Sequence, residues 1–142
     1  MVVLKGRKVF GGRVRGEALV SGEPISFFGG VDPDTGGVVE AGHPLQGACV
    51  AGRVLAFPRG KGSTVGSYTL YRLRKNGKAP AAILTGACET IVAVGAIISE
   101  IPCLDRVDIR RIPGGTVVEV DADRGTVTFA DLETHVRERE DA

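Results

Sequence analysis

Hydrophobic and polar residues alternate in the first third of the chain, which is the pattern of half-buried β-strands. In RVRGEALV, residues 13–20, the side chains of Val14, Ala18 and Val20 fall on one side of an extended backbone. The apolar run ISFF at 25–28 predicts a second strand. We therefore expect the amino-terminal third to consist largely of β structure.

A segment rich in glycine, proline and aspartate follows at 29–47, with the sequence GGVDPDTGGVVEAGHPLQG. This composition predicts a long loop, interrupted only by a short strand near 38–40. Long loops within compact domains often carry function. We interpret the paired glycines of the chain as turns; they lie at 11–12, 29–30, 36–37 and 114–115.

The middle of the chain predicts a strand, a glycine-rich loop and a helix, in that order. The segment GRVLAFP at 52–58 is typical of a short buried strand, and Pro58 ends it because proline has no N–H to donate to a strand ladder. After the loop that follows, Leu70 and Leu73 show helical spacing, and Gly77 marks the end of the helix.

The last third predicts a further strand, a second helix and a hairpin. AAIL at 81–84 indicates the strand, and ETIVAVGAIISE at 89–100 indicates a helix so apolar that we expect it to be buried on nearly all sides. TVVEV at 116–120 and TVTF at 126–129 predict the two strands of the hairpin. The charged tail at 131–142 is expected to be solvated. Together these elements predict an α/β fold with substantial sheet.

Length and charge exclude several classes of protein. The chain has 142 residues, with 18 basic and 17 acidic side chains and a formal net charge of +1, which suits one soluble domain spanning 1–142. A nearly neutral chain lacks the basic excess of a nucleic-acid-binding surface. The most apolar internal stretch, 91–98, is too short to span a bilayer. We therefore expect a cytoplasmic protein that binds neither nucleic acid nor membrane.

Three cysteines, Cys49, Cys88 and Cys103, are widely spaced and form no C-x-x-C pair. No nearby histidine completes the spacing of a zinc or cluster-binding site. We expect buried structural thiols rather than metal ligands.

The strongest local signal for chemistry is the segment PRGKGSTVGS at 58–67. Its glycines and hydroxyl side chains precede the predicted helix and follow the basic residues Arg59 and Lys61 closely. The start of a helix presents unpaired backbone N–H groups and a partial positive charge, and glycine lets a ligand approach the backbone closely. The segment therefore predicts a site for a phosphate or a carboxylate.

This segment is not a Walker A loop, because Gly62 separates Lys61 from the hydroxyl residue that should follow a P-loop lysine directly. Two roles for its hydroxyl groups stay open. In the simpler interpretation, Ser63 or Thr64 caps the helix. In the other, helix-end amides and neighbouring cations stabilise the alkoxide of Ser63, which then acts as a base.

The two histidines of the sequence, His43 and His135, do not complete a catalytic triad, and no G-x-S-x-G elbow surrounds Ser63. We expect His43 to fix a turn by hydrogen bonding. Asp32 and Asp34 are expected to form turn hydrogen bonds on either side of a proline, with a metal site as the lesser alternative.

Several motifs, taken in order, resemble the small subunit of the aconitase X group. They are GGVDPDTG, GHPLQG, VLAFPRGKGSTVGS, KAPAAIL and GAIISEIPCLD, and the resemblance covers roughly residues 10–110. Within this group the chain most resembles the separately encoded small subunits of archaeal phosphomevalonate dehydratases, which serve a modified mevalonate route to isoprenoids. The resemblance implies a swivelling β/β/α domain with a mixed sheet, like the mobile domain of aconitase.

The resemblance also implies a partner, a large subunit that carries an iron–sulfur cluster expected to be of the 4Fe–4S type. This chain would then need no cluster ligands. Ser63 matches the serine base of aconitase-like enzymes, which removes the proton beside the substrate carboxylate while the cluster iron acts as a Lewis acid on the leaving hydroxyl. The substrate-binding residues implied beside it are Arg59, Lys61, Gly62 and Thr64.

The reaction implied is the dehydration of (R)-5-phosphomevalonate to trans-anhydromevalonate 5-phosphate. Two alternatives stay open. One is another hydro-lyase of the same group, such as cis-3-hydroxy-L-proline dehydratase, whose small-subunit region is similar across the same GKGS loop. The other belongs to a different class, a non-catalytic binding or regulatory module that uses the loop at 59–64 to hold an anion.

Overall fold

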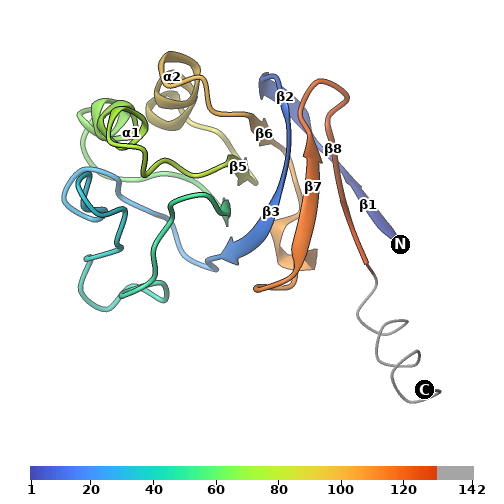
Figure 1. Ribbon diagram of the computed structural model, residues 1–142, viewed down its shortest axis with the longest axis horizontal. Helices are drawn as coiled ribbons and strands as arrows, with labels where there is room; N and C mark the ends of the chain where they lie inside the picture. The colour runs from blue at the N-terminus through green and yellow to red at the C-terminus, as the bar shows by residue number, and fades with distance from the viewer. Residues whose placement is uncertain (131–142) are drawn as a thin grey trace.

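The computed structural model describes residues 1–130, so the tail predicted at 131–142 lies outside the described residues. The strands are β1 Val2–Lys5, β2 Arg7–Phe10, β3 Arg13–Val20, β4 Val54–Phe57, β5 Ala82–Thr85, β6 Cys103–Asp105, β7 Val117–Asp121 and β8 Thr126–Phe129. The helices are α1 Gly66–Lys75 and α2 Thr90–Ile98, together with a short 3-10 helix, η1 Ile109–Arg111. Figure 1 shows their arrangement.

All eight of these strands belong to one mixed sheet, in the order β1-β8-β7-β3-β4-β5-β6-β2. Its centre is a run of four parallel strands, because β3, β4, β5 and β6 pair side by side in the same direction. Every residue of β4, β5 and β6 is buried. Parallel strands covered on both faces carry continuous apolar runs rather than alternation, which explains the sequences VLAF and AILT.

The two edge strands of the sheet, β1 and β2, are consecutive in the chain and are separated only by Gly6. At Gly6 the backbone N–H donates to the carbonyl oxygen of Gly125 in the β7–β8 turn (2.8 Å). A Cβ atom there would lie 2.7 Å from the carbonyl oxygen of Asp105, so only glycine fits. The chain thus crosses from one edge of the sheet to the other, and the sheet curls into a barrel-like wall.

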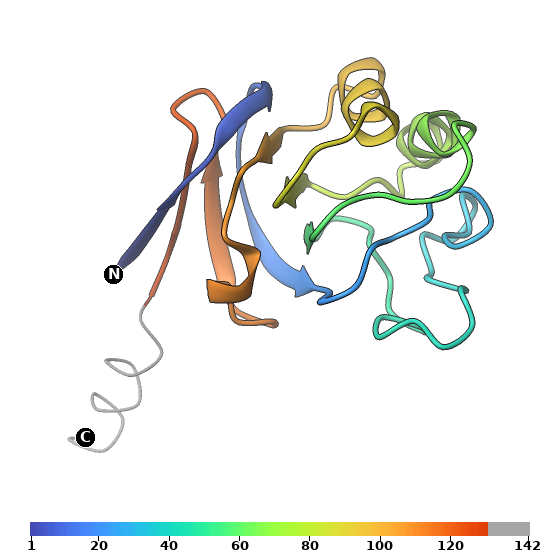
Figure 2. The same cartoon turned by 180° about the vertical axis from the view of Figure 1, so that it is seen from behind.

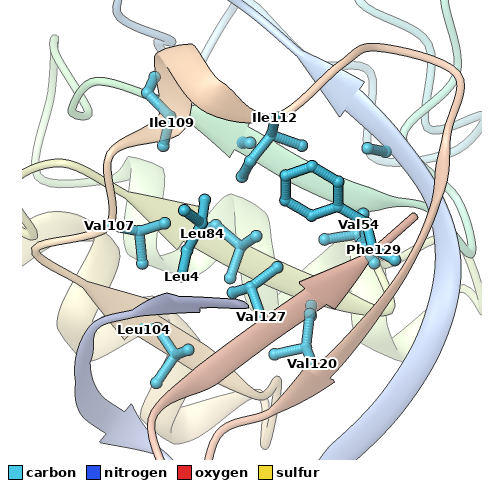
Figure 3. Packing of buried hydrophobic residues seen from close by; sticks show 14 of the residues in the cluster. Leu4, Val54, Leu84, Leu104, Val107, Ile109, Ile112, Val120, Val127 and Phe129 are labelled. Atoms are coloured by element: carbon cyan, nitrogen blue, oxygen red, sulfur yellow. The ribbon is translucent and has the colours of Figure 1, made fainter. Parts of the chain in front are cut away.

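The inner face of this wall encloses the first hydrophobic core, which Figure 3 shows from close by. Side chains from strands on both sides of the barrel meet there, together with residues that follow β6. The members labelled in the figure are Leu4, Val54, Leu84, Leu104, Val107, Ile109, Ile112, Val120, Val127 and Phe129.

The second hydrophobic core lies on the opposite face of the parallel strands, beneath both helices and the long loops. Leu70 and Leu73 of α1 and Val92 of α2 are fully buried in it. Phe27 packs edge-on against Phe57 of β4, with ring centroids 5.8 Å apart. Figures 1 and 2 show α1 and α2 on one side of the parallel strands β4, β5 and β6, with β7, β8 and β1, the curled part of the same sheet, on the other.

The structure confirms the α/β fold class with a mixed sheet, and several elements lie where the sequence predicted them. β3 spans the predicted residues 13–20, β4 and β5 form the two buried strands, and α1 ends in a turn whose Gly77 has a φ of +70°. The predicted carboxyl-terminal hairpin is β7–β8, which pairs antiparallel.

Two predicted strands are wrong. At 25–28 only Ile25 forms an isolated bridge, with Gly60, because the chain turns at 27–30, where the N–H of Val31 donates to the carbonyl oxygen of Phe27 (3.2 Å). Near 38–40 only Val38 forms a bridge, with Val31, within the long loop. The strands β1, β2 and β6 were not predicted.

The prediction that the second helix is buried on nearly all sides is also wrong. In α2 only Val92, Gly95 and Ala96 are buried, whereas Val94, Ile97 and Ile98 are 42%, 48% and 46% exposed. The helix belongs to the outer layer, so one face meets α1 and the sheet while the other carries apolar side chains outward. The apolar residues of α2 therefore lie both in the core and on the surface of the molecule.

The contact between the helices makes a first prediction, for Gly95→Val. A Cβ on Gly95 would lie 2.5 Å from Leu70 Cδ1 and 3.2 Å from Ser67 Cα, in a place without room to relax. Overpacking of this kind costs about 1–3 kcal/mol. We expect the free energy of unfolding in urea to fall by that amount. Gly114→Val is the control, because no atom lies within 4 Å of its Cβ position, and an equal loss in both variants would contradict the prediction.

Candidate functional site

The predicted anion-binding segment forms an exposed loop between β4 and α1. Its first half is anchored on the segment around Ile25, whose N–H donates to the carbonyl oxygen of Arg59 (3.2 Å) and whose carbonyl accepts from the N–H of Lys61 (2.9 Å). Beyond this anchor, residues 62–65 are all exposed. The loop therefore has a fixed base and an accessible tip.

Two glycines let this loop lie against its neighbours. A Cβ on Gly60 would lie 2.5 Å from a carboxylate oxygen of Glu89 and 2.7 Å from a methyl carbon of Val92. Gly62 has a φ of +91°, a region that side-chain-bearing residues rarely adopt, and a Cβ there would lie 2.5 Å from Ser26 Oγ. These close contacts explain why glycine occupies the positions on both sides of Lys61.

Ser63 lies at the tip of the loop, and its side chain folds back onto the start of α1. Its Oγ accepts a hydrogen bond from the backbone N–H of Val65 (3.1 Å), and its carbonyl oxygen accepts from the N–H of Gly66 (2.9 Å). Val65 itself supplies no side-chain cap. Of the two predicted caps, Ser63 thus serves the turn that leads into the helix, while no side-chain hydrogen bond of Thr64 occurs among residues 1–130.

The surroundings of Ser63 favour negative charge. The hydrogen bond from Val65 stabilises the deprotonated form of the hydroxyl more than the neutral form. The first turn of α1 contains no acidic residue, so its partial positive charge is not offset there. Within the described residues, no acceptor occupies the backbone N–H groups of Gly62, Ser63 or Thr64, which remain available to an anion.

The start of α2 differs in this respect. Glu89 caps it with both carboxylate oxygens, which accept hydrogen bonds from the N–H groups of Ile91 and Val92 at 3.0 Å each. A carboxylate of the protein thus fills the place that an external anion would need. Of the two helices in residues 1–130, only α2 is capped by an acidic side chain. The first amides of α1 donate to the carbonyl oxygens of Ser63, Thr64 and Val65, so the N–H groups available to an anion are those of the loop at 62–64.

The two cations of the loop have different environments. Lys61 Nζ lies 3.1 Å from Glu40 Oε2, an ion pair that ties the loop to the long loop at 29–47. Arg59 has an exposed side chain and forms no ion pair within residues 1–130. Instead it lines a depression at the carboxyl ends of the parallel strands, together with Arg106 and Arg110.

Sequence reasoning missed three of these residues. The role of Glu40 was not predicted, because its pairing with Lys61 is a tertiary contact between loops 21 positions apart. Arg106 and Arg110 follow β6, a strand of three residues that the pattern did not reveal. A signal for these two arginines was present in the apolar residues before Arg106, which form β6. Residues that follow parallel strands gather at one edge of a sheet, so a prediction of β6 would have placed Arg106 and Arg110 near the glycine loop.

The predicted turn roles of His43 and Asp32 are confirmed, whereas the side chain of Asp34 accepts from Asn76 Nδ2 (3.4 Å) and lies 3.8 Å from the Arg72 guanidinium instead. The buried His43 accepts from the N–H of Leu45 at Nδ1 (3.0 Å), so its proton is assigned to Nε2, which donates to the carbonyl oxygen of Pro24 (3.0 Å). Asp32 Oδ1 accepts from the N–H of Asp34 (2.9 Å), an Asx turn. No cluster of metal-ligating side chains occurs in residues 1–130.

The cysteines are not all buried, which corrects the prediction. Cys103 is buried and Cys88 half-buried, but Cys49 is exposed on the long-loop side, where its thiol contacts the carbonyl oxygen of Thr35 (3.4 Å). The hydrogen bond with Cys88 and burial both raise the pKa of the Cys103 thiol, whereas the same hydrogen bond lowers the pKa of Cys88. Cys103 is therefore held protonated.

Among the described residues, neither helix is long and apolar enough to cross a membrane.

Comparison with known proteins identifies relatives along most of the chain. The family model described as the aconitase X swivel domain matches residues 3–129. The phosphomevalonate dehydratase small subunit of Thermococcus kodakarensis is 58% identical over 124 residues, which cover 87% of this chain and 93% of that protein. The protein of the same name from Methanocella arvoryzae is 55% identical over 130 residues, covering 89% of this chain and 98% of its own length.

Solved structures show the same fold. The crystal structure of Thermococcus kodakaraensis aconitase X in its holo-form superposes with a TM-score of 0.91 at 55% identity, covering 92% of this chain and 100% of that chain. The solution NMR structure of a UPF0107 protein gives a TM-score of 0.84 at 49% identity, with the same coverage of 92% and 100%.

The geometry of the loop makes a second prediction, for Gly62→Ala. The methyl group would meet Ser26 Oγ and would strain a backbone with positive φ, so the tip of the loop must move. We expect amide chemical shifts to change at residues 60–66 and at Ser26 in two-dimensional NMR spectra. Gly42→Ala is the matched control, because its φ of +77° imposes the same backbone strain without any neighbour within 4 Å. Changes at 60–66 in the Gly42 variant would contradict this account.

Proposed function

This chain belongs to the aconitase X swivel-domain family, and we propose that it is the small subunit of a phosphomevalonate dehydratase, a hydro-lyase. The reaction is the loss of water from (R)-5-phosphomevalonate to give trans-anhydromevalonate 5-phosphate. Its relatives of that name support this substrate. The observation that carries the role of this chain is the exposed loop tip before α1, where Ser63 lies among backbone N–H groups at 62–64 that have no acceptor within residues 1–130. We treat residues 1–142 as one swivel domain and place the complex in the cytoplasm.

Ser63 acts as the general base in this proposal. Its alkoxide takes the proton from the carbon beside the substrate carboxylate, the bond from the neighbouring carbon to its hydroxyl group breaks with its electron pair, and an alkene and hydroxide form. Return of the proton from the Ser63 hydroxyl to that hydroxide gives water and restores the alkoxide. A serine hydroxyl has an ordinary acidity far too weak for this task, so its charged form must be stabilised. The N–H of Val65, donated to Ser63 Oγ, and the helix dipole of α1 supply that stabilisation.

The rest of the loop binds the substrate. The free N–H groups of Gly62 and Thr64 and the charge of Lys61 adjoin Ser63 in the loop and suit an anionic group of the substrate beside it, while Arg59, at the start of the loop, binds the substrate from the adjoining depression. Because Lys61 is paired with Glu40, its ammonium group is held in position rather than free to follow the substrate. Fixed charges of this kind stabilise a transition state without reorganising during the reaction.

The complex needs a large subunit, and the surface of this chain supports one. Large apolar side chains are exposed in two places. Those in the loops and at the start of α1 are Phe28, Val39, Val65 and Tyr68, and those on the outer face of α2 are Val94, Ile97 and Ile98. Seven exposed large apolar side chains on these segments offer apolar area that a partner subunit would cover. The three cysteines within residues 1–130 form no ligand cluster, so we assign the 4Fe–4S cluster to the large subunit. The part of this chain is then proton removal and substrate binding.

The role of Ser63 predicts the effect of Ser63→Ala in the assembled complex. A general base contributes about 10²- to 10⁴-fold to the rate. We expect kcat to fall by that factor, and exchange of the proton beside the substrate carboxylate with deuterated water to be lost. The iron content of the complex and its mass on a sizing column should not change.

Ser67→Ala is the matched control for that variant. Ser67 lies one helical turn further along, and its hydroxyl donates to the carbonyl oxygen of Ile91 rather than toward the loop tip. Turnover should stay within a few-fold of the unmodified complex. If the Ser63→Ala complex keeps both its turnover and its proton exchange, Ser63 is not the general base.

The substrate is tested by offering the complex two compounds together under anaerobic conditions, 5-phosphomevalonate and cis-3-hydroxy-L-proline. Mass spectrometry should show loss of one water from the phosphorylated compound alone. Loss of water from the proline derivative would keep the reaction class and change the substrate. If the cluster-loaded complex dehydrates neither, the loop is better explained as an anion-binding module without catalysis.

A further inference from the structure

The carboxyl ends of the four parallel strands lie level with one another. Val20 pairs with Ala56, Phe57 with Thr85, and Leu84 with Leu104, so the residues that follow the strand ends form a row across the sheet. Backbone hydrogen bonds continue the pairing beyond the strand ends. The N–H of Gly86 donates to the carbonyl oxygen of Pro58 and the N–H of Arg106 to that of Gly86, at 3.1 Å each, while after β3 the N–H of Ser21 donates to the carbonyl oxygen of Ala56 (2.8 Å). The row consists of Pro58, Gly86 and Arg106, with Gly22 beside it after the end of β3.

A depression lies along this row. It is lined by the row itself and by Val107 and Ile109, which are among the side chains of the barrel core in Figure 3. At Gly22 no atom lies within 4 Å of the position that a Cβ would take, and at Gly86 the nearest is 3.4 Å away. The absence of side chains at these two positions keeps the depression open at the mouth of the barrel.

Positive charge dominates the walls of the depression. Arg59, Arg106 and Arg110 line it, against a single acidic residue, Asp108. Arg110 Nε lies 3.3 Å from Asp108 Oδ1, which balances one of the three charges. Within residues 1–130, Arg59 and Arg106 take part in no ion pair, and both are exposed. Two guanidinium groups are thus free to bind an anion.

Arg106 has a strained backbone. Its φ is +57°, in the left-handed region, and its N–H is held by the carbonyl oxygen of Gly86 (3.1 Å). Glycine adopts this conformation without strain, so an arginine here is kept at some cost in stability. Backbone strain at the rim of an open, charged depression points to a role for the side chain rather than for the fold.

We propose that this depression binds the phosphate group of the substrate, with Arg59 and Arg106 as the principal ligands and Arg110 at the rim. This inference rests on the proposed function and adds the residues that recognise the far end of the substrate. Guanidinium groups match the oxygen geometry of a phosphate and bind it in a bidentate manner. Arg59 also begins the loop that leads to Ser63, so the depression and the glycine loop share a wall.

The test uses the complex with its large subunit and the variant Arg106→Gly, which removes the side chain and relieves the backbone strain. Hydrogen bonds to a charged group contribute enough to change affinity about 10- to 100-fold. We expect KM for 5-phosphomevalonate to rise by that factor while kcat changes little. Competitive inhibition by inorganic phosphate should be lost in the variant, and Arg106→Lys should recover part of both.

Arg111→Gln is the matched control. Arg111 is an exposed arginine that lies in η1 next to Arg110, but it does not line the depression. It should leave KM and phosphate inhibition unchanged. The inference is overturned if Arg106→Gly keeps its KM and its phosphate inhibition, or if it weakens assembly with the large subunit without changing KM. Failure of the unmodified complex to dehydrate 5-phosphomevalonate would instead overturn the proposed function.

Discussion

The parallel pairing of β3, β4, β5 and β6 is the constraint on which the rest of the molecule depends. Strands that run in one direction must end at one edge, and each connection then starts from that edge. The glycine loop follows β4 and Arg106 follows β6, so residues nearly 50 positions apart reach the same side of the sheet. Burial of β4, β5 and β6 on both faces fixes this register, because any slip would expose apolar side chains.

A second constraint is the absence of side chains at three contacts. Gly60 lets the loop approach Glu89, Gly62 lets it pass Ser26, and Gly95 lets α2 lie against Leu70. The helices and the loop are therefore in direct contact, so the position of Ser63 is set by the packing of the second core. Because a well-packed core deforms little, a loop built on it can hold an exposed hydroxyl group in one place.

The sequence predicted the parts of the fold that depend on local pattern. β3 alternates, β4 and β5 are apolar runs bounded by turn residues, and α1 shows helical spacing before Gly77. The loop with Ser63 was found for the same reason, since its glycines and hydroxyls are contiguous. The pairing of Lys61 with Glu40 and the gathering of arginines past β6 depend on topology, which no local pattern contains. The outer face of α2 was misjudged because composition alone does not distinguish a buried face from a face that awaits a partner.

The exposure of Ser63 shows what this chain lacks. An alkoxide is stabilised by hydrogen bonds and a helix dipole far more effectively when bulk water is excluded, because water screens such interactions. The loop tip at 62–65 is open to solvent in the isolated chain, so nothing within residues 1–130 supplies that exclusion. The exposed apolar side chains of Phe28, Val65 and Tyr68 provide a rim that a partner could cover. In the proposed mechanism, closure of this domain on a large subunit brings Ser63 to the substrate and removes water from it in the same movement.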